Sequence, residues 1–253
     1  MTRTLVYAHR GSSRSAPENT MAAFMKAVSE GAEGIELDVH LTANREVVVI
    51  HDETLDRTAG VPGKVADKSA GELARLRVGR WFSEDFADER IPLLSEVLEW
   101  LRDTDVELNI ELKNGIIRYP GLEEAVVGLV ERYGFTDRVV ISSFNHFSLR
   151  HLRHFRPGLR LAALYVCGMV EPWMYAKHLG VDGIHPHHLA CPDEVVEGCR
   201  KSGIRVRPWT VDDPAEAERL IRAGVDALIT NLPSKMLEVR NRLVRLPGEE
   251  EQC

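Results

Sequence analysis

The sequence predicts one α/β domain, a (β/α)8 barrel with a small insertion after its second β/α region. Short strand-like runs alternate with helical patterns along nearly the whole chain. The length of 253 residues suits a single barrel, which typically has about 250 residues. Eight predicted strands, each followed by a helix, favour a closed parallel barrel. An open doubly wound sheet built from the same units remains an alternative.

The predicted strands are short apolar runs bounded by polar residues or glycine. They cover Leu5–His9, Gly34–Val39, Val106–Leu112, Arg138–Ser142, Arg160–Tyr165, Gly183–His185, Ile204–Pro208 and Ala227–Thr230. Helices are predicted at Asn19–Glu30, Leu94–Arg102, Leu122–Tyr133, His146–Phe155, Glu171–Leu179, Pro192–Lys201, Pro214–Ala223 and Ser234–Arg242. Thr20 or Asn19 can cap the first helix, and Gly31 follows its end. Gly224 ends the helix that begins at Pro214.

One segment interrupts the alternation of strands and helices. Residues 53–90 follow an extra strand-like run, Glu46–His51, and are too long for a simple β/α connection. We expect them to form a small insertion over one end of the barrel. The barrel domain is expected to span residues 1–243. Residues 244–253 are expected to form a charged, flexible tail, and the sequence indicates no role for Cys253.

Composition limits the classes of partner. A net charge of -7 argues against nucleic acid, because such binding depends on Lys and Arg that neutralise phosphates. It still allows a small phosphorylated substrate, since a metal ion can supply local positive charge. No apolar stretch is long enough for a signal peptide or a membrane span, and the four cysteines lack Cys-x-x-Cys spacing. We therefore expect a cytoplasmic protein, and the oligomeric state stays open.

Acidic residues interrupt the strand predicted at Gly34–Val39. Strands of a parallel sheet are buried on both faces and should be almost continuously apolar. Glu36 and Asp38 are two residues apart, so both side chains point to the same face. Two buried carboxylates repel each other unless a cation neutralises them. A divalent metal with oxygen ligands is the simplest explanation.

A second strand repeats this pattern. Glu111 and Lys113 share one face of the run that ends at Leu112, whereas the apolar residues point to the other face. Glu111 would complete a three-carboxylate site, and Lys113 would meet a phosphate bound by the metal. The alternative is a structural network in which cationic side chains alone neutralise the acids.

Two histidines are expected at the same end of the barrel. His9 and His51 end strand-like runs, and strand ends of this kind surround the active site of a barrel enzyme. Histidine titrates near neutrality, so a pair can exchange acid and base roles across a scissile bond. Arg10, beside His9, offers the paired donors that bind phosphate. Read singly, a strand-end histidine is more often structural and Arg10 more often a surface ion-pairing residue; the combination with three acids on neighbouring strands favours function.

Taken together, these motifs resemble those of the glycerophosphodiester phosphodiesterase family. The resemblance extends from His9 to Pro233, and the ordered set of motifs is far more specific than any one of them. The matching segments are His9-Arg10-Gly11, Pro17-Glu18-Asn19-Thr20, Ile35-Glu36-Leu37-Asp38-Val39, His51-Asp52, Leu55-Asp56-Arg57-Thr58, Glu111-Leu112-Lys113, Ser143-Phe144, Trp209-Thr210-Val211 and Ile229-Thr230-Asn231-Leu232-Pro233.

The resemblance implies a (β/α)8 barrel enzyme and a role for each candidate residue. Glu36, Asp38 and Glu111 would hold one divalent ion, Mg²⁺ or Ca²⁺, with Mn²⁺ as a further candidate. His9 and His51 would act as general base and general acid. The products would be glycerol 3-phosphate and an alcohol such as choline or ethanolamine.

The resemblance also implies how the substrate is bound. Arg10 and Lys113 would bind phosphate, and Trp209 would line the pocket near the glycerol moiety, unless it only packs inside the barrel. Asp212 departs from the asparagine that is common in the family after Trp-Thr-Val. This difference leaves the substrate preference open. The attacking group, water or a hydroxyl of the substrate itself, is open as well.

Three other functions are compatible with parts of this pattern. A phosphodiesterase for larger lipids, of the lysophospholipase D type, would need an apolar mouth. The candidates for such a mouth are Trp81, Phe82, Phe86 and Trp173. A noncatalytic phosphate-binding barrel would be expected to have lost a histidine or a carboxylate. A barrel isomerase or aldolase would not explain the paired histidines. The cluster His185–His188 fits a polar loop better than a second metal site.

Overall fold

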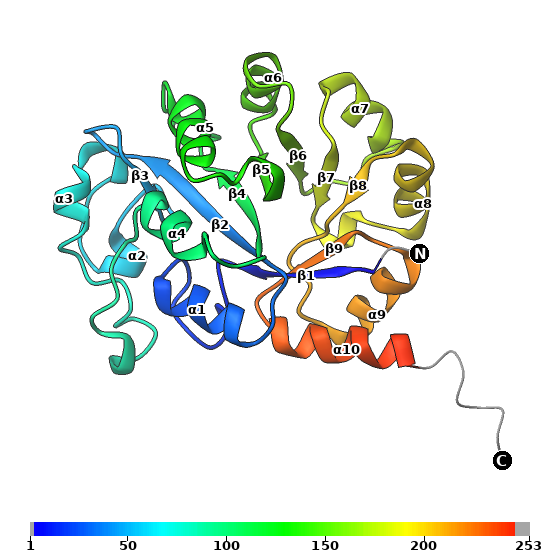
Figure 1. Cartoon of the computed structure of the whole chain (residues 1–253), viewed down its shortest axis with the longest axis horizontal. Helices are drawn as coiled ribbons and strands as arrows, with labels where there is room; N and C mark the ends of the chain where they lie inside the picture. Colours follow the sequence, from blue (N-terminus) through cyan, green and yellow to red (C-terminus); the bar gives the residue numbers. More distant parts are fainter. Residues whose placement is uncertain (1–2, 246–253) are drawn as a thin grey trace.

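The computed structural model describes residues 3–245 and contains a nearly closed parallel barrel surrounded by helices (Figure 1). Strands neighbour one another in the order β8-β7-β6-β5-β4-β2-β1-β9. The barrel strands are β1 (Leu5–His9), β2 (Gly34–Leu41), β4 (Glu107–Leu112), β5 (Val139–Ser143), β6 (Arg160–Tyr165), β7 (Gly183–Pro186), β8 (Arg205–Val206) and β9 (Ala227–Thr230). The predicted fold class is confirmed, and the open-sheet alternative is wrong.

Backbone hydrogen bonds between the chain at β8 and strand β9 bring the ends of the sheet together. Asp226 N donates to Val206 O at 2.9 Å, and Ile229 N donates to Pro208 O at 3.0 Å. Val211 N returns a bond to Ile229 O at 2.9 Å. β8 is shorter than predicted because Pro208 has no N–H to donate to the ladder. Its carbonyl nevertheless takes part in the closure.

The helices around the barrel begin and end close to the predicted positions. They are α1 (Met21–Ser29), α4 (Leu94–Leu101), α5 (Leu122–Arg132), α6 (His146–Phe155), α7 (Pro172–Leu179), α8 (Asp193–Ser202), α9 (Pro214–Ala223) and α10 (Pro233–Arg245). Thr20 caps α1, because its side chain accepts a hydrogen bond from Ala23 N. Asp213 caps α9 in the same way, through Glu216 N.

Strand β2 places its two kinds of side chain on opposite faces. All of its residues are buried. Ile35, Leu37 and Val39 belong to the main hydrophobic core between strands and helices. Alternation therefore directs Glu36 and Asp38 into the barrel. The apolar face stabilises the fold, and this stabilisation allows the strand to hold two acids inside.

The interior of the barrel is filled below the level of these acids. Tyr7, fully buried, hydrogen bonds through its hydroxyl to Glu107. A Cβ on Gly34 would lie 2.4 Å from the Tyr7 ring, so only glycine fits beside it. Arg160 Nη1 bonds Glu107 Oε1 at 3.2 Å, and the Arg207 guanidinium lies 5.8 Å from the Tyr7 ring. With this end filled, a substrate is expected to enter from the carboxyl ends of the strands.

The predicted insertion lies between β3 (Val47–Val49), which pairs antiparallel with β2, and helix α4. It is the cyan segment at the left of Figure 1. It contains α2 (Asp56–Ala59), α3 (Ala70–Leu73) and the 3-10 helices η1 (Val65–Asp67) and η2 (Glu84–Phe86). Its small apolar cluster consists of Val48, Ile50, Leu55, Val65, Leu73, Val78 and Ile91. That separate cluster gives this segment a packed interior of its own.

Two expectations concern the termini and membranes. Residues 246–253, most of the predicted tail, and Cys253 among them, lie outside the described residues. Among residues 3–245, no helix combines the length and apolar character needed to cross a bilayer.

Candidate active site

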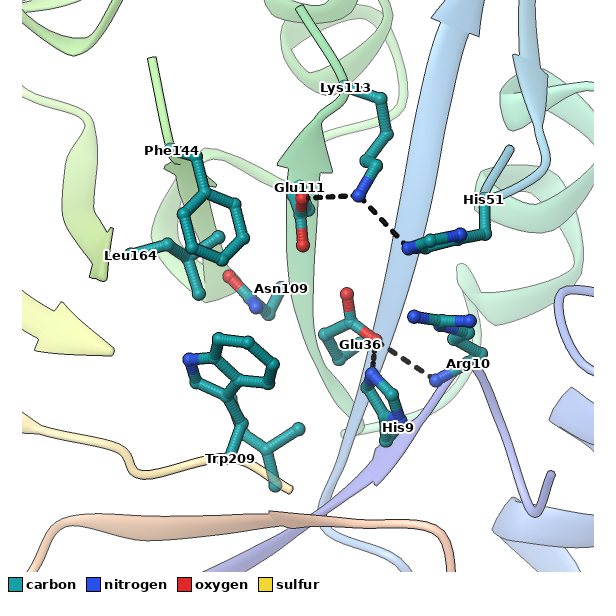
Figure 2. Close-up of a pocket in the computed structure, with 11 residues that line it drawn as sticks. His9, Arg10, Glu36, His51, Asn109, Glu111, Lys113, Phe144, Leu164 and Trp209 are labelled. Atoms are coloured by element: carbon teal, nitrogen blue, oxygen red, sulfur yellow. Dashed lines mark hydrogen bonds and ion pairs between the residues drawn. The ribbon is translucent and has the colours of Figure 1, made fainter. Parts of the chain in front are cut away.

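The predicted site residues meet in one cavity of about 80 Å³ inside the barrel (Figure 2). Its lining is formed by His9, Arg10, Glu36, His51, Asn109, Glu111, Lys113, Phe144, Leu164, Trp209 and Ile229. Asp38, the remaining predicted residue, is buried beside the cavity and contacts Arg10. The sequence prediction therefore brought together side chains that are neighbours in space.

Three buried carboxylates form the centre of the site. Glu36, Asp38 and Glu111 each present an oxygen within 4.8 Å of the others, and at most 9% of any of the three is exposed. The pairing of β2 with β4 sets this arrangement, because Asp38 lies opposite Glu111 in the register. Side chains of the two strands that point into the barrel therefore converge.

The protonation of these acids differs with their neighbours. Burial, and then the charges of Asp38 and Glu111, raises the pKa of Glu36 well above its usual value. Burial and Asp38 raise the pKa of Glu111 to about 7. Burial acts in the same direction on Asp38, but Arg10 and Lys113 outweigh it and hold the pKa of Asp38 below its usual value. The cluster therefore carries less negative charge than three free carboxylates.

The donor set fits a divalent cation. Asp38 Oδ1 is buried and accepts no hydrogen bond from any of residues 3–245, although Lys113 Nζ lies 3.7 Å away. An unpaired buried carboxylate oxygen is unfavourable unless a cation or a water completes its environment. Hard oxygen donors in such a cluster are the ligands that Mg²⁺, Ca²⁺ and Mn²⁺ prefer. The cluster could hold one such ion.

Arg10 joins the first strand to the acidic cluster. Its backbone N–H donates to Glu36 Oε2 at 3.0 Å, and its Nε lies 3.2 Å from Asp38 Oδ2. Its φ of 57° turns the chain sharply at the end of β1. Gly11 follows because a Cβ there would lie 2.6 Å from the backbone of Ala23 in α1. The His-Arg-Gly motif thus places an imidazole and a guanidinium side by side.

Lys113 bridges the acids and one of the histidines. Its Nζ donates to Glu111 Oε1 at 2.9 Å and lies 3.1 Å from His51 Nε2. Figure 2 shows the ammonium group between these two side chains, facing the cavity. An anionic substrate group that entered here would meet both Lys113 and Arg10.

His9 is held by a contact that the sequence analysis missed. Its Nδ1 lies 2.8 Å from Asn231 Oδ1, and its Nε2 lies 4.0 Å from Glu36 Oε2. Asp212 Oδ2 accepts from Asn231 Nδ2 at 2.6 Å, which leaves the amide oxygen for the imidazole. Asn231 was quoted only as part of a motif, and the departure at Asp212 provides the carboxylate that orients it.

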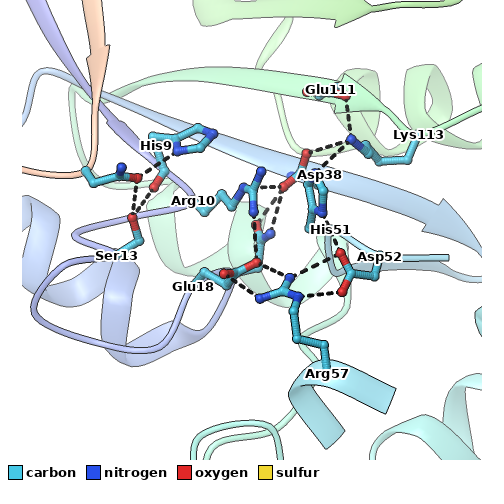
Figure 3. A network of polar contacts seen from close by, with 12 residues as sticks. His9, Arg10, Ser13, Glu18, Asp38, His51, Asp52, Arg57, Glu111 and Lys113 are labelled. Carbon is cyan, nitrogen blue, oxygen red and sulfur yellow. Dashed lines mark hydrogen bonds and ion pairs between the residues drawn. The ribbon is translucent and has the colours of Figure 1, made fainter. Parts of the chain in front are cut away.

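A second network holds His51, as Figure 3 shows. His51 Nδ1 lies 2.6 Å from Asp52 Oδ1. Arg57 Nε donates to Asp52 Oδ2 at 2.6 Å, and its Nη1 donates to Glu18 Oε2 at 2.9 Å. Arg10 Nη1 in turn donates to Glu18 Oε1 at 2.9 Å. Asp52 and Arg57 both belong to motifs that match the family, but no role was predicted for either.

Trp209 and His185 occupy different environments. Trp209 lines the cavity, where its ring meets that of Phe144 edge to face at 5.6 Å. Its Nε1 donates to the backbone oxygen of His185 at 2.8 Å. The His185 side chain is fully buried, and neither ring nitrogen has a partner among residues 3–245. His185 therefore belongs to the barrel interior, whereas the sequence pattern favoured a polar loop.

A nearly closed (β/α)8 barrel with a carboxylate cluster, two histidines and two cations around one cavity defines the class of protein. It is a barrel hydrolase for anionic esters. The model of the glycerophosphoryl diester phosphodiesterase family matches residues 9–235. The chain belongs to this family and is an enzyme of the phosphoric diester hydrolase class.

Individual relatives agree with this assignment. The chain is 48% identical over 237 residues to a glycerophosphodiester phosphodiesterase of Caldanaerobacter subterraneus, covering 94% of this chain and 98% of the relative. It is 39% identical to a glycerophosphodiester phosphodiesterase of Bacillus altitudinis, covering 95% and 99%. A phosphodiesterase of Oleispira antarctica, solved with the product sn-glycerol-3-phosphate, superposes with a TM-score of 0.87 at 30% identity, covering 94% and 97%.

Proposed function

We propose that the enzyme hydrolyses glycerophosphodiesters to glycerol 3-phosphate and an alcohol. Water, or a hydroxyl of the substrate, forms a new bond to phosphorus as the bond between phosphorus and the alcohol oxygen breaks. Attack by water gives glycerol 3-phosphate directly, whereas attack by the substrate hydroxyl gives a cyclic phosphate, and water then adds to phosphorus and opens the ring to glycerol 3-phosphate. The first oxygen loses a proton, and the departing oxygen gains one. The observation that carries the proposal is the placement of two oriented imidazoles around one cavity with three carboxylates and two cations. The glycerol 3-phosphate bound in the Oleispira relative supports this choice of product.

His9 is proposed as the general base. Burial, and then the nearby charge of Arg10, lowers the pKa of His9 to about 4. The imidazole is therefore neutral at neutral pH and can accept a proton. With its Nδ1–H donated to Asn231 Oδ1 at 2.8 Å, Nε2 keeps the lone pair and faces the carboxylate side of the cavity. Asn231 thus selects the tautomer that a base at this position needs.

His51 is proposed as the general acid that protonates the leaving alcohol. Asp52 lies on Nδ1, so Nε2 is the nitrogen that faces the cavity and the substrate. Lys113 and Arg10 are proposed to bind the nonbridging phosphate oxygens, because both cations line the same cavity. In the absence of substrate their charges are balanced by Glu111, Asp38 and Glu18.

Glu36, Asp38 and Glu111 are proposed to hold one Mg²⁺, Ca²⁺ or Mn²⁺ ion. When bound, such an ion neutralises charge that develops on the phosphate oxygens. The atom that supports this site is Asp38 Oδ1, which is buried and accepts no hydrogen bond from residues 3–245. Trp209, together with Phe144, is proposed to face the carbon chain of the glycerol moiety, since both rings line the cavity.

Hydrolysis of a panel of glycerophosphodiesters tests this function. Metal-stripped protein is supplied with Mg²⁺, Ca²⁺ or Mn²⁺, and release of glycerol 3-phosphate is followed. We expect release that requires a metal and falls by at least about 100-fold in His51→Ala and Glu36→Gln. His154→Ala, a change at an exposed histidine on α6, is the matched control and should retain wild-type activity. Folded protein that cleaves no member of the panel with any metal would rule out the proposal.

A second candidate, hydrolysis of lipid-bearing phosphodiesters, is favoured by apolar residues around the mouth of the barrel. Eight exposed large apolar side chains lie after strands β4, β5, β6 and β7: Ile116, Phe144, Phe147, Val166, Val170, Met174, Tyr175 and Leu189. Of the aromatic residues expected from sequence, Trp81 is 43% exposed and its ring lies 5.8 Å from the Arg57 guanidinium. Phe82 lies edge to face with both Trp81 and Phe86, and Trp173 packs against the barrel core.

Comparing glycerophosphocholine with lysophosphatidylcholine separates the two candidates. A lipid-specific enzyme would cleave the lysophospholipid faster, and Phe147→Ser or Val170→Ser would reduce only that rate, because each removes an exposed apolar contact. Equal loss on both substrates, or no loss, would count against the lipid candidate.

A cytoplasmic location is also proposed. Cys167, Cys191 and Cys199 form no disulfide within residues 3–245, which suits a reducing compartment. Fractionation of cells that produce the protein tests this.

A further inference from the structure

Arg57 connects the insertion to the mouth of the barrel. It lies on α2, and its guanidinium contacts two carboxylates outside that helix (Figure 3). Nε and Nη2 donate to the two oxygens of Asp52 at 2.6 and 3.1 Å. Nη1 and Nη2 donate to the two oxygens of Glu18 at 2.9 and 2.7 Å. The planar guanidinium makes two hydrogen bonds to each carboxylate and so fixes the orientation of both, whereas one hydrogen bond to each would let them rotate.

Asp52 passes this constraint to His51. Its Oδ1 lies 2.6 Å from His51 Nδ1, and an ionised carboxylate can only accept, so Nδ1 carries a proton that stays on the contact with Asp52. The proton that a general acid donates is a second one, on Nε2. The opposite nitrogen, Nε2, then faces Lys113 and the cavity. The His51 side chain is 29% exposed and follows β3 in a loop. Its ring nitrogens have two side-chain partners, Asp52 at Nδ1 and Lys113 at Nε2. A phosphate that binds Lys113 would compete for the second partner, so Asp52 is the contact that keeps the ring oriented when substrate is bound.

We infer that Arg57 is a positioning residue for His51: it clamps Asp52, and Asp52 aims the imidazole at the leaving group. The insertion thereby supplies part of the catalytic geometry, although none of its side chains needs to touch the substrate. This inference rests on the proposed role of His51 as general acid.

The effect of Arg57 on His51 is one of geometry more than of charge. Burial tends to raise the pKa of Asp52, but hydrogen bonds from Arg57 and His51 outweigh it and lower that pKa to about 2. A free aspartate already titrates near 3.9, so Asp52 would stay ionised at neutral pH without Arg57. Removing Arg57 would therefore leave the Asp52 carboxylate charged but free to rotate away from His51.

A purely structural role for Arg57 makes a different prediction. The Arg57 side chain is 43% exposed, and ion pairs at that exposure contribute little to folding stability. If Arg57 only tethered the insertion, its loss would affect all substrates alike. If it positions a general acid, the loss should matter only where the leaving group must be protonated.

Two substrates that share the glycerophosphoryl group and differ in leaving group separate these roles. Glycerophosphocholine releases an alkoxide that requires a proton, whereas glycerophospho-p-nitrophenol releases a phenolate that leaves without one. For Arg57→Ala on the choline ester we expect kcat to fall roughly 10- to 100-fold and KM to change less than about threefold. On the nitrophenyl ester kcat should change less than about threefold. Arg57→Lys, which keeps charge but not the fork, should recover only part of the rate.

A double variant tests the route through Asp52. If Arg57 acts through Asp52, Arg57→Ala combined with Asp52→Ala should be no slower than Asp52→Ala alone. Arg80→Ala is the control, because Arg80 is an arginine of the same insertion that pairs with Glu84 on the surface. It should match wild type on both esters. Thermal unfolding of each variant verifies that the fold persists, and Arg57→Lys serves if Arg57→Ala does not fold.

His51→Ala distinguishes failure of the inference from failure of the proposed function. If His51→Ala loses activity selectively on the choline ester while folded Arg57→Ala loses equally on both esters or on neither, the positioning role is overturned and the general acid stands. If His51→Ala itself shows no dependence on the leaving group, the general-acid role is overturned and the inference with it. Additive losses in the double variant would overturn the route through Asp52.

Discussion

The acidic cluster is expected to release protons when it binds a divalent ion. Burial and the neighbouring charge of Asp38 raise the pKa of Glu111 to about 7, and they raise the pKa of Glu36 well above its usual value. A carboxyl with a pKa near 7 is about 90% protonated at pH 6, whereas a metal ligand must be ionised. Binding at pH 6 should therefore displace close to one proton from Glu111 and add a contribution from Glu36.

The sign of the pH dependence follows from this competition. Protons and metal compete for the same oxygens, so the apparent affinity falls as the pH decreases through the raised pKa values. Between pH 7 and pH 6 the apparent affinity should fall about fivefold for a carboxyl with a pKa of about 7, such as Glu111. The loss approaches tenfold only for a carboxyl that is already mostly protonated at pH 7. Asp38, whose pKa is held below its usual value, should contribute nothing in this range.

Isothermal titration calorimetry of metal-stripped protein at pH 6 measures the released protons. The observed heat is compared in two buffers that differ in ionisation enthalpy, and the difference gives the number of protons. Glu111→Gln should bind the metal more weakly and release about one proton fewer than wild type. Identical heats in the two buffers would refute the reasoning, because they would mean that the carboxyls are already ionised before the metal binds.

Three further changes test individual contacts. Asn231→Ala removes the acceptor for His9 Nδ1, so kcat should fall roughly 10- to 100-fold with little change in KM; an unchanged kcat would show that His9 needs no such partner. Trp209→Ala opens the cavity and should raise KM for glycerophosphodiesters about tenfold in steady-state kinetics, a prediction that an unaltered KM contradicts. Gly34→Ala would place a Cβ 2.4 Å from the Tyr7 ring and should destabilise the protein by about 1–3 kcal/mol in urea unfolding; wild-type stability would mean that the ring moves freely.

Much of the fold and the acidic centre of the site could be predicted from the local alternation of apolar and polar residues in the sequence. Alternation in β2 directs Glu36 and Asp38 inward because successive side chains on a strand point to opposite faces. The same rule, applied to Glu111, brings a third acid to the cluster from β4. An acid in an otherwise apolar buried strand indicates a functional residue, because a buried carboxylate is unfavourable unless a cation or a hydrogen-bond donor neutralises it.

Pattern was less informative where neighbours come from distant parts of the chain. His9 contacts Asn231 across a separation of 222 residues, and no periodicity links them. Arg57 is only five residues from Asp52, but it also binds Glu18, 39 residues away, and no rule of strand or helix spacing predicts that one side chain contacts both. Most of the exposed apolar residues that follow strands β4 to β7 were likewise not predicted, because exposure depends on packing between elements.

The sequence by itself thus determined the alternation of strands and helices, the inward acids and the strand-end histidines and cations, all of which obey periodicities of a few residues. Only the tertiary structure decided which nitrogen of each histidine faces the cavity, because that choice depends on hydrogen-bond partners from other elements. Asn231, which follows β9, binds Nδ1 of His9, and Asp52, which follows β3, binds Nδ1 of His51, so Nε2 of each ring faces the cavity. Asn231 reaches the mouth because β9 is a parallel barrel strand and ends there. Asp52 reaches it by another route: β3 pairs antiparallel with β2 and leads the chain back to Asp38, where Ile50 N donates to Asp38 O at 3.0 Å.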